Sequence, residues 1–223
     1  MAQTQSGKPL IGILALDERI KEIFKAIALI VFALIFLFFL YAFRIQIGNA
    51  ILPWLRLVID LIETEYQIGE FFIQRSKNEW VFHLRLVTDY PIELFGYKFP
   101  RMDASSSTLV THALLHFFII PMLAIAGLCY QKLDKIKLFI FTCLALFISL
   151  ALDIPFTLLG SIEGVLIQSF APQKLDSNWL VIWERFLTNG GRLAIPIALG
   201  LLALICAQKE MSSNVKNTTM LKK

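Results

Sequence analysis

Two histidines and two glutamates in this sequence have a spacing and a setting that could support metal chemistry. His112 and His116 are four positions apart, so a helix places both rings on one face, as two ligands of one metal ion require. Glu163 or Glu184 could add a carboxylate oxygen. However, no HExxH motif and no fixed third ligand accompany the histidines. We therefore favour hydrogen-bonded histidines near a membrane surface, and we expect neither a metal site nor a cofactor.

Asp153 and Arg192 are opposite charges whose positions suggest an ion pair. Asp153 lies 16 positions after Lys137, and Arg192 lies 17 positions before Lys209. With a rise of about 1.5 Å per residue, both charges stand roughly 24 to 26 Å from the basic ends of their helices, and His116 reaches the same depth. A lone charge at the centre of a bilayer costs about 2.5 to 3.5 kcal/mol, whereas an opposite charge inside a helix bundle offsets it. The spacing thus predicts an Asp153–Arg192 pair.

Two wider interpretations of this layer stay open. In the simpler one, Arg192 extends toward the membrane interface and Asp153 marks a helix end, so both are boundary residues. In the other, the ionisable residues of this layer and of the connection beyond it line a polar pocket. Its members would be His112, His116, Asp153, Glu163, Glu184 and Arg192.

The elements that must hold these residues are long uncharged runs. The chain has 223 residues, of which 57% are hydrophobic and only 17% charged, and its mean hydropathy is +0.68. A soluble domain is ordinarily about one quarter charged, so this composition argues against a disordered chain or a disulfide scaffold. The net charge of +4 forms no basic patch with interleaved aromatics, which argues against a nucleic-acid module. The runs predict four transmembrane helices, at residues 26–44, 108–130, 138–153 and 186–208.

Basic residues near the span ends predict the orientation of the chain. They concentrate in the N-terminal segment 1–25, in the tight connection after residue 130 and in the tail 209–223. The positive-inside rule then places both termini in the cytoplasm. The long connection 45–107 faces outward. Residues 154–185 form a second outward segment, in which we expect an interfacial or re-entrant helix.

The outward connection has a pattern of its own. Apolar residues recur at helical spacing from residue 51 to residue 66, with Pro53 in the first turn, which predicts an amphipathic helix on the membrane surface. Residues 68–88 alternate around a polar break and predict a β-hairpin, to which residues 90–95 could add a third strand. The serines at 105–107 are typical of the cap before a helix.

These elements predict a membrane α-helical fold. It is a four-transmembrane-helix bundle with a small extracytoplasmic α+β insertion, an amphipathic helix plus a β-hairpin, between helices 1 and 2. This topology assembles no nucleophile. Cys129, Cys143 and Cys206 lie in or beside apolar runs, roughly 15 Å or more along the helix axes from the histidine layer, and no GxSxG motif is present. Whether the chain is an enzyme stays open, with a non-enzymatic role favoured.

Two short motifs give the chain a resemblance to a known family. Residues 96–100 (Gly-Tyr-Lys-Phe-Pro) lead into the second span, and residues 189–193 (Asn-Gly-Gly-Arg-Leu) begin the last one. With the single anchor and the outward α-plus-β segment, this arrangement resembles the exosortase H-associated membrane proteins. That family is associated with bacterial sorting of proteins that carry a C-terminal recognition helix. The exosortases themselves resemble cysteine transpeptidases, whereas no cysteine faces outward here, so the resemblance implies an accessory role.

The sequence therefore predicts an accessory or scaffold protein of the bacterial inner membrane. Its partners are expected to be the lipid bilayer and, as the resemblance implies, an exosortase-like membrane protease or its substrate, and not nucleic acid. We expect contact through the hairpin, at Phe72, Trp80, Phe82 and Leu84. The alternative is an integral-membrane enzyme or small transporter that uses the polar pocket.

Overall fold

The structure is a computed structural model that describes residues 9–62, 67–87, 92–94, 97–99 and 103–208. The described chain is mostly helical and contains a small antiparallel sheet. It divides into two compact units, residues 1–39 and residues 40–223, and each is described by itself.

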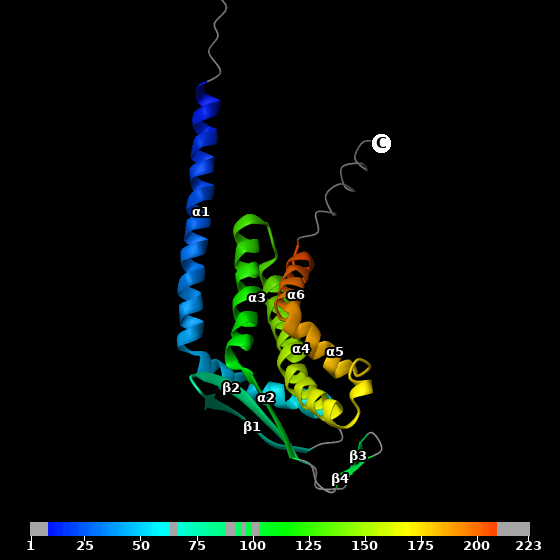
Figure 1. The fold of residues 1–223 in the computed structure, drawn as a ribbon. Coiled ribbons are helices and arrows are strands. Elements are labelled where there is room, and N and C mark those ends of the chain that lie inside the picture. The colour runs from blue at the N-terminus through cyan, green and yellow to red at the C-terminus, as the bar shows by residue number, and fades with distance from the viewer. Residues whose placement is uncertain (1–8, 63–66, 88–91, 95–96, 100–102, 209–223) are drawn as a thin grey trace, which may run out of the picture. The chain divides into compact units, whose positions relative to one another are not determined.

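The first unit contains most of helix α1 (Pro9–Ala42), drawn in blue in Figure 1. From Arg19 to Ala42 this helix is long and apolar enough to cross a membrane, and nearly all of its large apolar side chains are exposed. A helix that is apolar on every side is stable in lipid rather than in water. It covers most of the predicted span at residues 26–44.

Helix α2 (Arg44–Ile62) follows in the second unit. The sequence predicts a helix that starts near residue 51 with Pro53 in its first turn. The helix instead begins seven positions earlier, and Pro53 lies inside it, because a single turn residue separates α2 from α1. Leu55 and Ile59 on one face are fully buried, whereas the opposite face carries exposed polar side chains. The amphipathic character predicted for this segment is present.

The main sheet contains three antiparallel strands in the order β1–β2–β5. β1 (Gln67–Ser76) and β2 (Glu79–Val87) form the predicted hairpin, joined by a tight turn in which Lys77 has a positive φ of 54°. The third strand is β5 (Asp103–Leu109), which pairs with β2. The serines at 105–107 therefore lie in a strand, so the prediction of a helix cap at these residues is wrong.

A second, two-stranded sheet is formed by β3 (Ile92–Leu94) and β4 (Tyr97–Phe99). The expected third strand of the hairpin, at residues 90–95, thus pairs elsewhere over the three residues that the structure describes. The reason is that β2 has β1 on one edge and β5 on the other, so it has no free edge for a further strand.

Three helices of the second unit pack against one another: α3 (Val110–Tyr130), α4 (Lys135–Phe170) and α6 (Arg192–Cys206) (Figure 1). After α4 the chain passes through a 3₁₀ turn, η1 (Pro172–Lys174), to helix α5 (Trp179–Phe186). A kinked segment, η2 (Leu187–Gly191), in which Asn189 and Gly190 depart from helical geometry, joins α5 to α6. We call the whole stretch from Trp179 to Cys206 the kinked α5–α6 helix. Because α5 packs on α4 and α6 packs on both α3 and α4, this helix closes the bundle.

Helix α4 is 36 residues long and runs through Asp153 and Pro155 without a break. The sequence predicts a span that ends at residue 153 and a separate interfacial or re-entrant helix beyond it. For residues 154–170 this prediction is wrong, because they continue the same helix. Proline removes a single backbone donor, and the carboxylate is paired inside the bundle, as the next subsection describes. At about 1.5 Å per residue, α4 is about 54 Å long, well beyond a hydrocarbon thickness of about 30 Å.

The main core lies where the sheet, α2 and α4 meet. Phe82 and Leu84 of β2 are fully buried there with Ile59 of α2 and Leu158 of α4. Alternate residues of a strand face opposite sides of the sheet, and these two side chains occupy the core side. The prediction that Phe82 and Leu84 form a contact surface is therefore wrong.

Among the described residues, five helical stretches are long and apolar enough to cross a membrane by length and composition. They lie in α1, α2, α3, α4 and the kinked α5–α6 helix. The sequence predicts four, and the difference is α2, which also meets the length and hydropathy criteria. These helices are consistent with an integral membrane protein.

Candidate functional site

A column of polar side chains runs into the bundle from the end that carries the sheet. On each contributing segment the polar residues recur every four positions, and this spacing places them on one face of a helix. We call this set the polar column. It consists of Thr108, His112 and His116 from β5 and α3, Ser149, Asp153, Thr157 and Ser161 from α4, and Glu184, Thr188 and Arg192 from the kinked α5–α6 helix.

Asp153 is the fully buried centre of the polar column. Its Oδ1 accepts hydrogen bonds from Arg192 Nε at 2.9 Å and from Thr157 Oγ1 at 3.1 Å. Its Oδ2 accepts from His116 Nε2 at 2.8 Å and from Arg192 Nε at 3.1 Å. A buried carboxylate is tolerated where it is paired and hydrogen-bonded. The ion pair predicted from the span lengths is thus present, and Asp153 is not a helix-end residue as the boundary interpretation requires.

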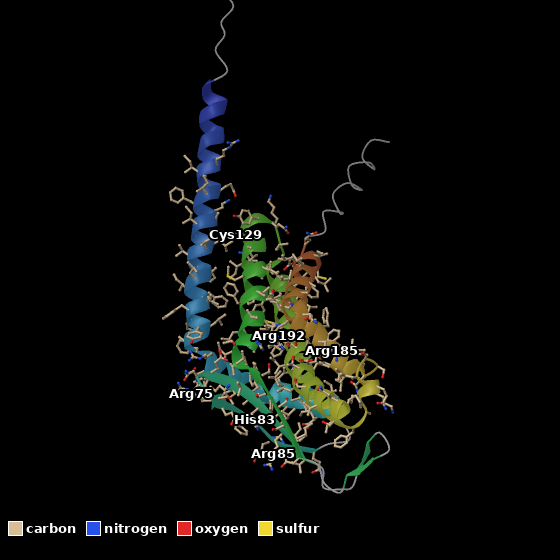
Figure 2. All side chains as sticks on the ribbon, viewed as in Figure 1. Arg75, His83, Arg85, Cys129, Arg185 and Arg192 are labelled. Carbon is tan, nitrogen blue, oxygen red and sulfur yellow. The ribbon has the colours of Figure 1, made fainter. Side chains whose placement is uncertain are left out.

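Arg192 is held by three side chains. In addition to the Asp153 bond, its Nη2 donates to Thr157 Oγ1 at 2.9 Å and its Nη1 donates to His112 Nε2 at 3.2 Å. Figure 2 shows Arg192 among the bundle helices, well away from Cys129, which lies near the end of α3. Its side chain is 13% exposed. The guanidinium is therefore fixed in orientation while part of it stays accessible.

The contact with Arg192 determines the tautomer of His112. An arginine side chain has donors only, so His112 Nε2 must accept with its lone pair, and the ring proton is on Nδ1. Nδ1 lies 3.1 Å from Thr108 Oγ1 and donates to it. Because the nitrogen beside Thr108 already carries a proton, it cannot remove one from the hydroxyl. This pair is consequently unsuited to activating Thr108 as a nucleophile.

His116 links Asp153 to Ser149 in the deepest part of the polar column. His116 Nε2 donates to the carboxylate, and its Nδ1 lies 2.6 Å from Ser149 Oγ. The order of groups matches a Ser-His-Asp arrangement. However, all three side chains are fully buried, so a substrate carbonyl cannot reach the hydroxyl. The arrangement satisfies buried polar groups and is not an open catalytic triad.

The part of the polar column nearest the sheet lines a cavity of about 700 Å³. Arg192, His112 and Thr157 line it from the helices, together with Ser161, Glu184 and Thr188. The sheet supplies the other wall, through the hairpin turn and the end of β5. These residues are Ser76, Lys77, Asn78, Glu79, Val81, Ser107, Thr108 and Leu109. The sheet and the bundle therefore build one site together.

Apolar side chains follow the polar column beyond His116 and Ser149, on the side of the α3–α4 connection. The next residues at the four-position spacing are Ile120 on α3 and Ala145 on α4, and both are buried together with Ala203 of α6. The polar lining therefore gives way to an apolar core in this direction.

Two glycines position the kinked α5–α6 helix, which carries Arg192. At Gly160, a Cβ would stand 2.6 Å from Glu184 Cβ and 2.7 Å from the Leu180 carbonyl oxygen, so only glycine allows α5 to approach α4 this closely. At Gly190, φ is +117°, a backbone conformation that glycine adopts without strain. This residue bends the chain between α5 and α6 immediately before Arg192.

Of the six residues predicted to line a pocket, the structure brings five together. His112, Arg192 and Glu184 line the cavity, while His116 and Asp153 lie behind it. Glu163 is elsewhere, where its Oε2 accepts from Asn178 Nδ2 at 3.5 Å. Sequence reasoning missed the hydroxyl members of the polar column. Their signal was the four-position spacing from each ionisable residue: Thr108 before His112, Ser149 and Thr157 on either side of Asp153, and Thr188 before Arg192.

The two histidines do not form the metal pair considered from their spacing. His112 is bonded to Arg192 and His116 to Asp153. Within the described residues, no group of three or more histidine, cysteine, aspartate or glutamate side chains is placed to hold a metal ion.

The rest of the predicted contact surface lies on the sheet. Phe72 is exposed and packs on His83 with ring centroids 5.3 Å apart, and Trp80 is half-buried. Their role as contact residues stays a prediction. On the same sheet, two nitrogens of Arg85 donate to Asp103 at 2.9 and 2.6 Å, and this carboxylate raises the pKa of Arg85 above its ordinary value.

Searches of protein-family models, of curated proteins and of solved structures find no match to this chain.

Proposed function

We propose that the chain is an accessory protein of the bacterial inner membrane that binds a polar ligand or partner group in the cavity at its outer face. The single observation that carries this proposal is the state of Arg192. It is fixed by Asp153, Thr157 and His112, it remains partly exposed, and it lines a cavity whose opposite wall is the sheet. A fixed and accessible donor group loses little entropy on binding, so it favours recognition.

In this proposal four segments span the membrane and both termini are cytoplasmic. The spans are α1, α3, the first part of α4 and the kinked α5–α6 helix, while α2 lies along the outer surface. Polar residues on one face of α2 and its contacts with β1 support the surface position. The length of α4 supports an outer end that projects beyond the lipid, where the sheet and the cavity surround it.

Binding fits the cavity better than catalysis or transport does. Proton placement on His112 leaves Thr108 without a base, and Ser149 is fully buried. Beyond the polar column the bundle is filled by the apolar residues Ile120, Ala145 and Ala203, an unfavourable setting for a polar solute to cross. An enzyme or small transporter remains the alternative function, because buried ionisable residues inside a membrane bundle are a common sign of one.

The resemblance of two sequence motifs to the exosortase H-associated membrane proteins supports a role beside a protein-sorting enzyme. One of those motifs, residues 189–193, contains the glycine bend and Arg192. The segment that carries the resemblance thus forms the bend and supplies one cavity residue, Arg192. In this setting the partner would be a membrane protein, contacted through the sheet at Phe72 and Trp80.

Two measurements test this proposal. Reporter fusions after Lys77 and after Lys222 are expected to lie outside and inside, respectively; both in one compartment would contradict the orientation. A photo-crosslinking amino acid at Asn78, which lines the cavity, is expected to form an adduct in cells that is lost in Thr188→Val, a cavity variant outside the Asp153 hydrogen bonds. The matched control is the same probe at Arg75, outside the cavity lining. Adducts that persist at Asn78 in the variant would rule out cavity binding.

A further inference from the structure

The charges that line the cavity are balanced in sign. Lys77 and Arg192 are cationic, and Glu79 and Glu184 are anionic. Behind the wall, Asp153 already neutralises Arg192. A purely anionic ligand would therefore meet no net positive field, and a purely cationic ligand would meet the guanidinium. A ligand that carries both charges satisfies both sets of side chains.

Arg192 provides the anion-binding half of this arrangement. A guanidinium has five N–H donors. The hydrogen bonds to Asp153, Thr157 and His112 use one N–H from each of its three nitrogens. One N–H on each terminal nitrogen is left, a pair suited to two oxygens of a phosphate or carboxylate group. Ser161, one turn beyond Thr157 on α4, adds a hydroxyl to the lining of the same cavity.

Glu184 provides the cation-binding half. It precedes Arg192 by eight positions on the kinked α5–α6 helix, and its Oε1 accepts a hydrogen bond from Thr188 Oγ1 at 3.1 Å. Its close packing on Gly160 keeps it against α4, at the cavity wall. An ammonium group needs acceptors, and the carboxylates of Glu184 and Glu79 with the neighbouring hydroxyls supply them.

The kinked α5–α6 helix also has an apolar side that is exposed. While Glu184, Thr188 and Arg192 line the cavity, other residues of the same helix present large apolar side chains to the surroundings; these are Trp179, Ile182, Phe186, Leu193 and Ile197. At Gly190, in the kink, no atom other than those of its own neighbours in the chain lies within 4 Å of the point where a Cβ would stand. One kinked helix thus carries both polar side chains that line the cavity and an exposed apolar side.

From this arrangement we infer that the cavity binds the headgroup of a zwitterionic phospholipid with a primary ammonium group, phosphoethanolamine, whose acyl chains lie along the apolar side of the kinked α5–α6 helix. The phosphate is bound by Arg192 and the ammonium group by Glu184. This inference rests on the proposed function, since it names the ligand of the same cavity. It is independent of which protein the sheet contacts.

The experiment uses the purified full-length chain in a neutral detergent, with the thermal unfolding midpoint as the readout. Short-chain phosphatidylethanolamine is titrated against short-chain phosphatidylglycerol and phosphatidylcholine, because these differ in headgroup charge or in ammonium N–H donors. We expect phosphatidylethanolamine to raise the midpoint at about tenfold lower concentration than either competitor. Equal shifts with all three lipids would overturn the inference, as would a preference for phosphatidylglycerol, which would indicate an anion site.

Free phosphoethanolamine and inorganic phosphate distinguish the source of the headgroup. The inference predicts weak shifts from both, because neither has acyl chains to cover the apolar side of the kinked α5–α6 helix. A shift equal to that of the lipid would indicate a soluble ligand and overturn the lipid assignment.

Glu184→Gln is expected to abolish the preference for phosphatidylethanolamine over phosphatidylcholine. The matched control, Glu163→Gln, lies outside the cavity and should keep it. If the preference is absent while crosslinking from Asn78 still depends on Thr188, the proposed binding function stands and only the lipid assignment fails.

Discussion

Arg192 Nε lies 2.9 and 3.1 Å from the two carboxylate oxygens of Asp153, although the two residues are 39 positions apart in the chain. The same carboxylate accepts hydrogen bonds from His116 and from Thr157. One buried acid therefore connects α3, α4 and α6. The pair joins the helices of the bundle and orients the guanidinium at the cavity wall, so we expect stability and the proposed ligand binding to depend on the same contact.

Breaking this pair should destabilise the protein strongly. Asp153→Asn and Arg192→Gln are each expected to lower the free energy of unfolding by about 3 to 5 kcal/mol, because each leaves a buried charge without its partner. The double variant should lose less than the two single losses combined, by about 0.5 to 3 kcal/mol. Unfolding in one fixed detergent measures all three. The exposed Arg85–Asp103 pair is the control, and its coupling should be smaller. Strict additivity for Asp153 and Arg192 would contradict the pairing.

Two threonines on α4 allow a matched test of the hydroxyl contribution. Thr157 Oγ1 bonds to both Asp153 and Arg192, whereas Thr142 Oγ1 is buried with no hydrogen-bond partner. Replacement by valine keeps the shape and removes the hydroxyl. Thr157→Val is expected to destabilise the protein by about 1 to 3 kcal/mol, and Thr142→Val to be neutral or stabilising. Thermal unfolding compares the two variants directly, and equal effects would show that the network around Asp153 contributes nothing at Thr157.

The glycine bend before α6 predicts another contrast. Gly190 has φ of +117° and open space around its Cβ position, so an alanine there is strained by its backbone and not by contact. Gly190→Ala should lower stability by more than about 0.4 to 1 kcal/mol. Gly164, inside α4, has room for a Cβ, which would stand 3.9 Å from Val181. Gly164→Ala should raise stability by about 0.5 to 1 kcal/mol through helix propensity. Unfolding midpoints that rise in both variants would exclude the bend at residue 190.

The sheet predicts a clear separation between core and surface aromatics. Phe82 is fully buried and Phe72 is exposed, although the two strands pair side by side. Phe82→Ala should lower stability by about 3 to 5 kcal/mol, while Phe72→Ala should change it by less than about 0.5 kcal/mol. If Phe72 contacts a partner, its variant should lose that contact at normal protein abundance. Abundance that falls equally in both variants would place Phe72 in the core and contradict the exposure described here.

Much of the fold follows from local sequence patterns. Uncharged runs located α1, α3 and α6, and strict alternation located the β1–β2 hairpin, because hydrophobic periodicity is a property of neighbouring residues. The layer of His116, Asp153 and Arg192 was also predictable, since the distance from each basic helix end sets the depth of a side chain. The helix starting at Arg44 and the continuation of α4 past Asp153 were missed, because Pro53 and a charged residue imitate helix boundaries in a single sequence.

The sequence alone determined which residues share a helix face and at what depth they lie. It did not determine which of them meet. Asp153 accepts hydrogen bonds from two other helices, Thr157 bridges acid and guanidinium, and the β1–β2 turn and β5 wall the cavity. These contacts were decided only by the packing of the sheet, α3, α4 and the kinked α5–α6 helix. The physical reason is that depth along a helix follows from its fixed rise per residue, whereas contact between helices depends on rotation and approach, which close-packed positions such as Gly160 set in three dimensions.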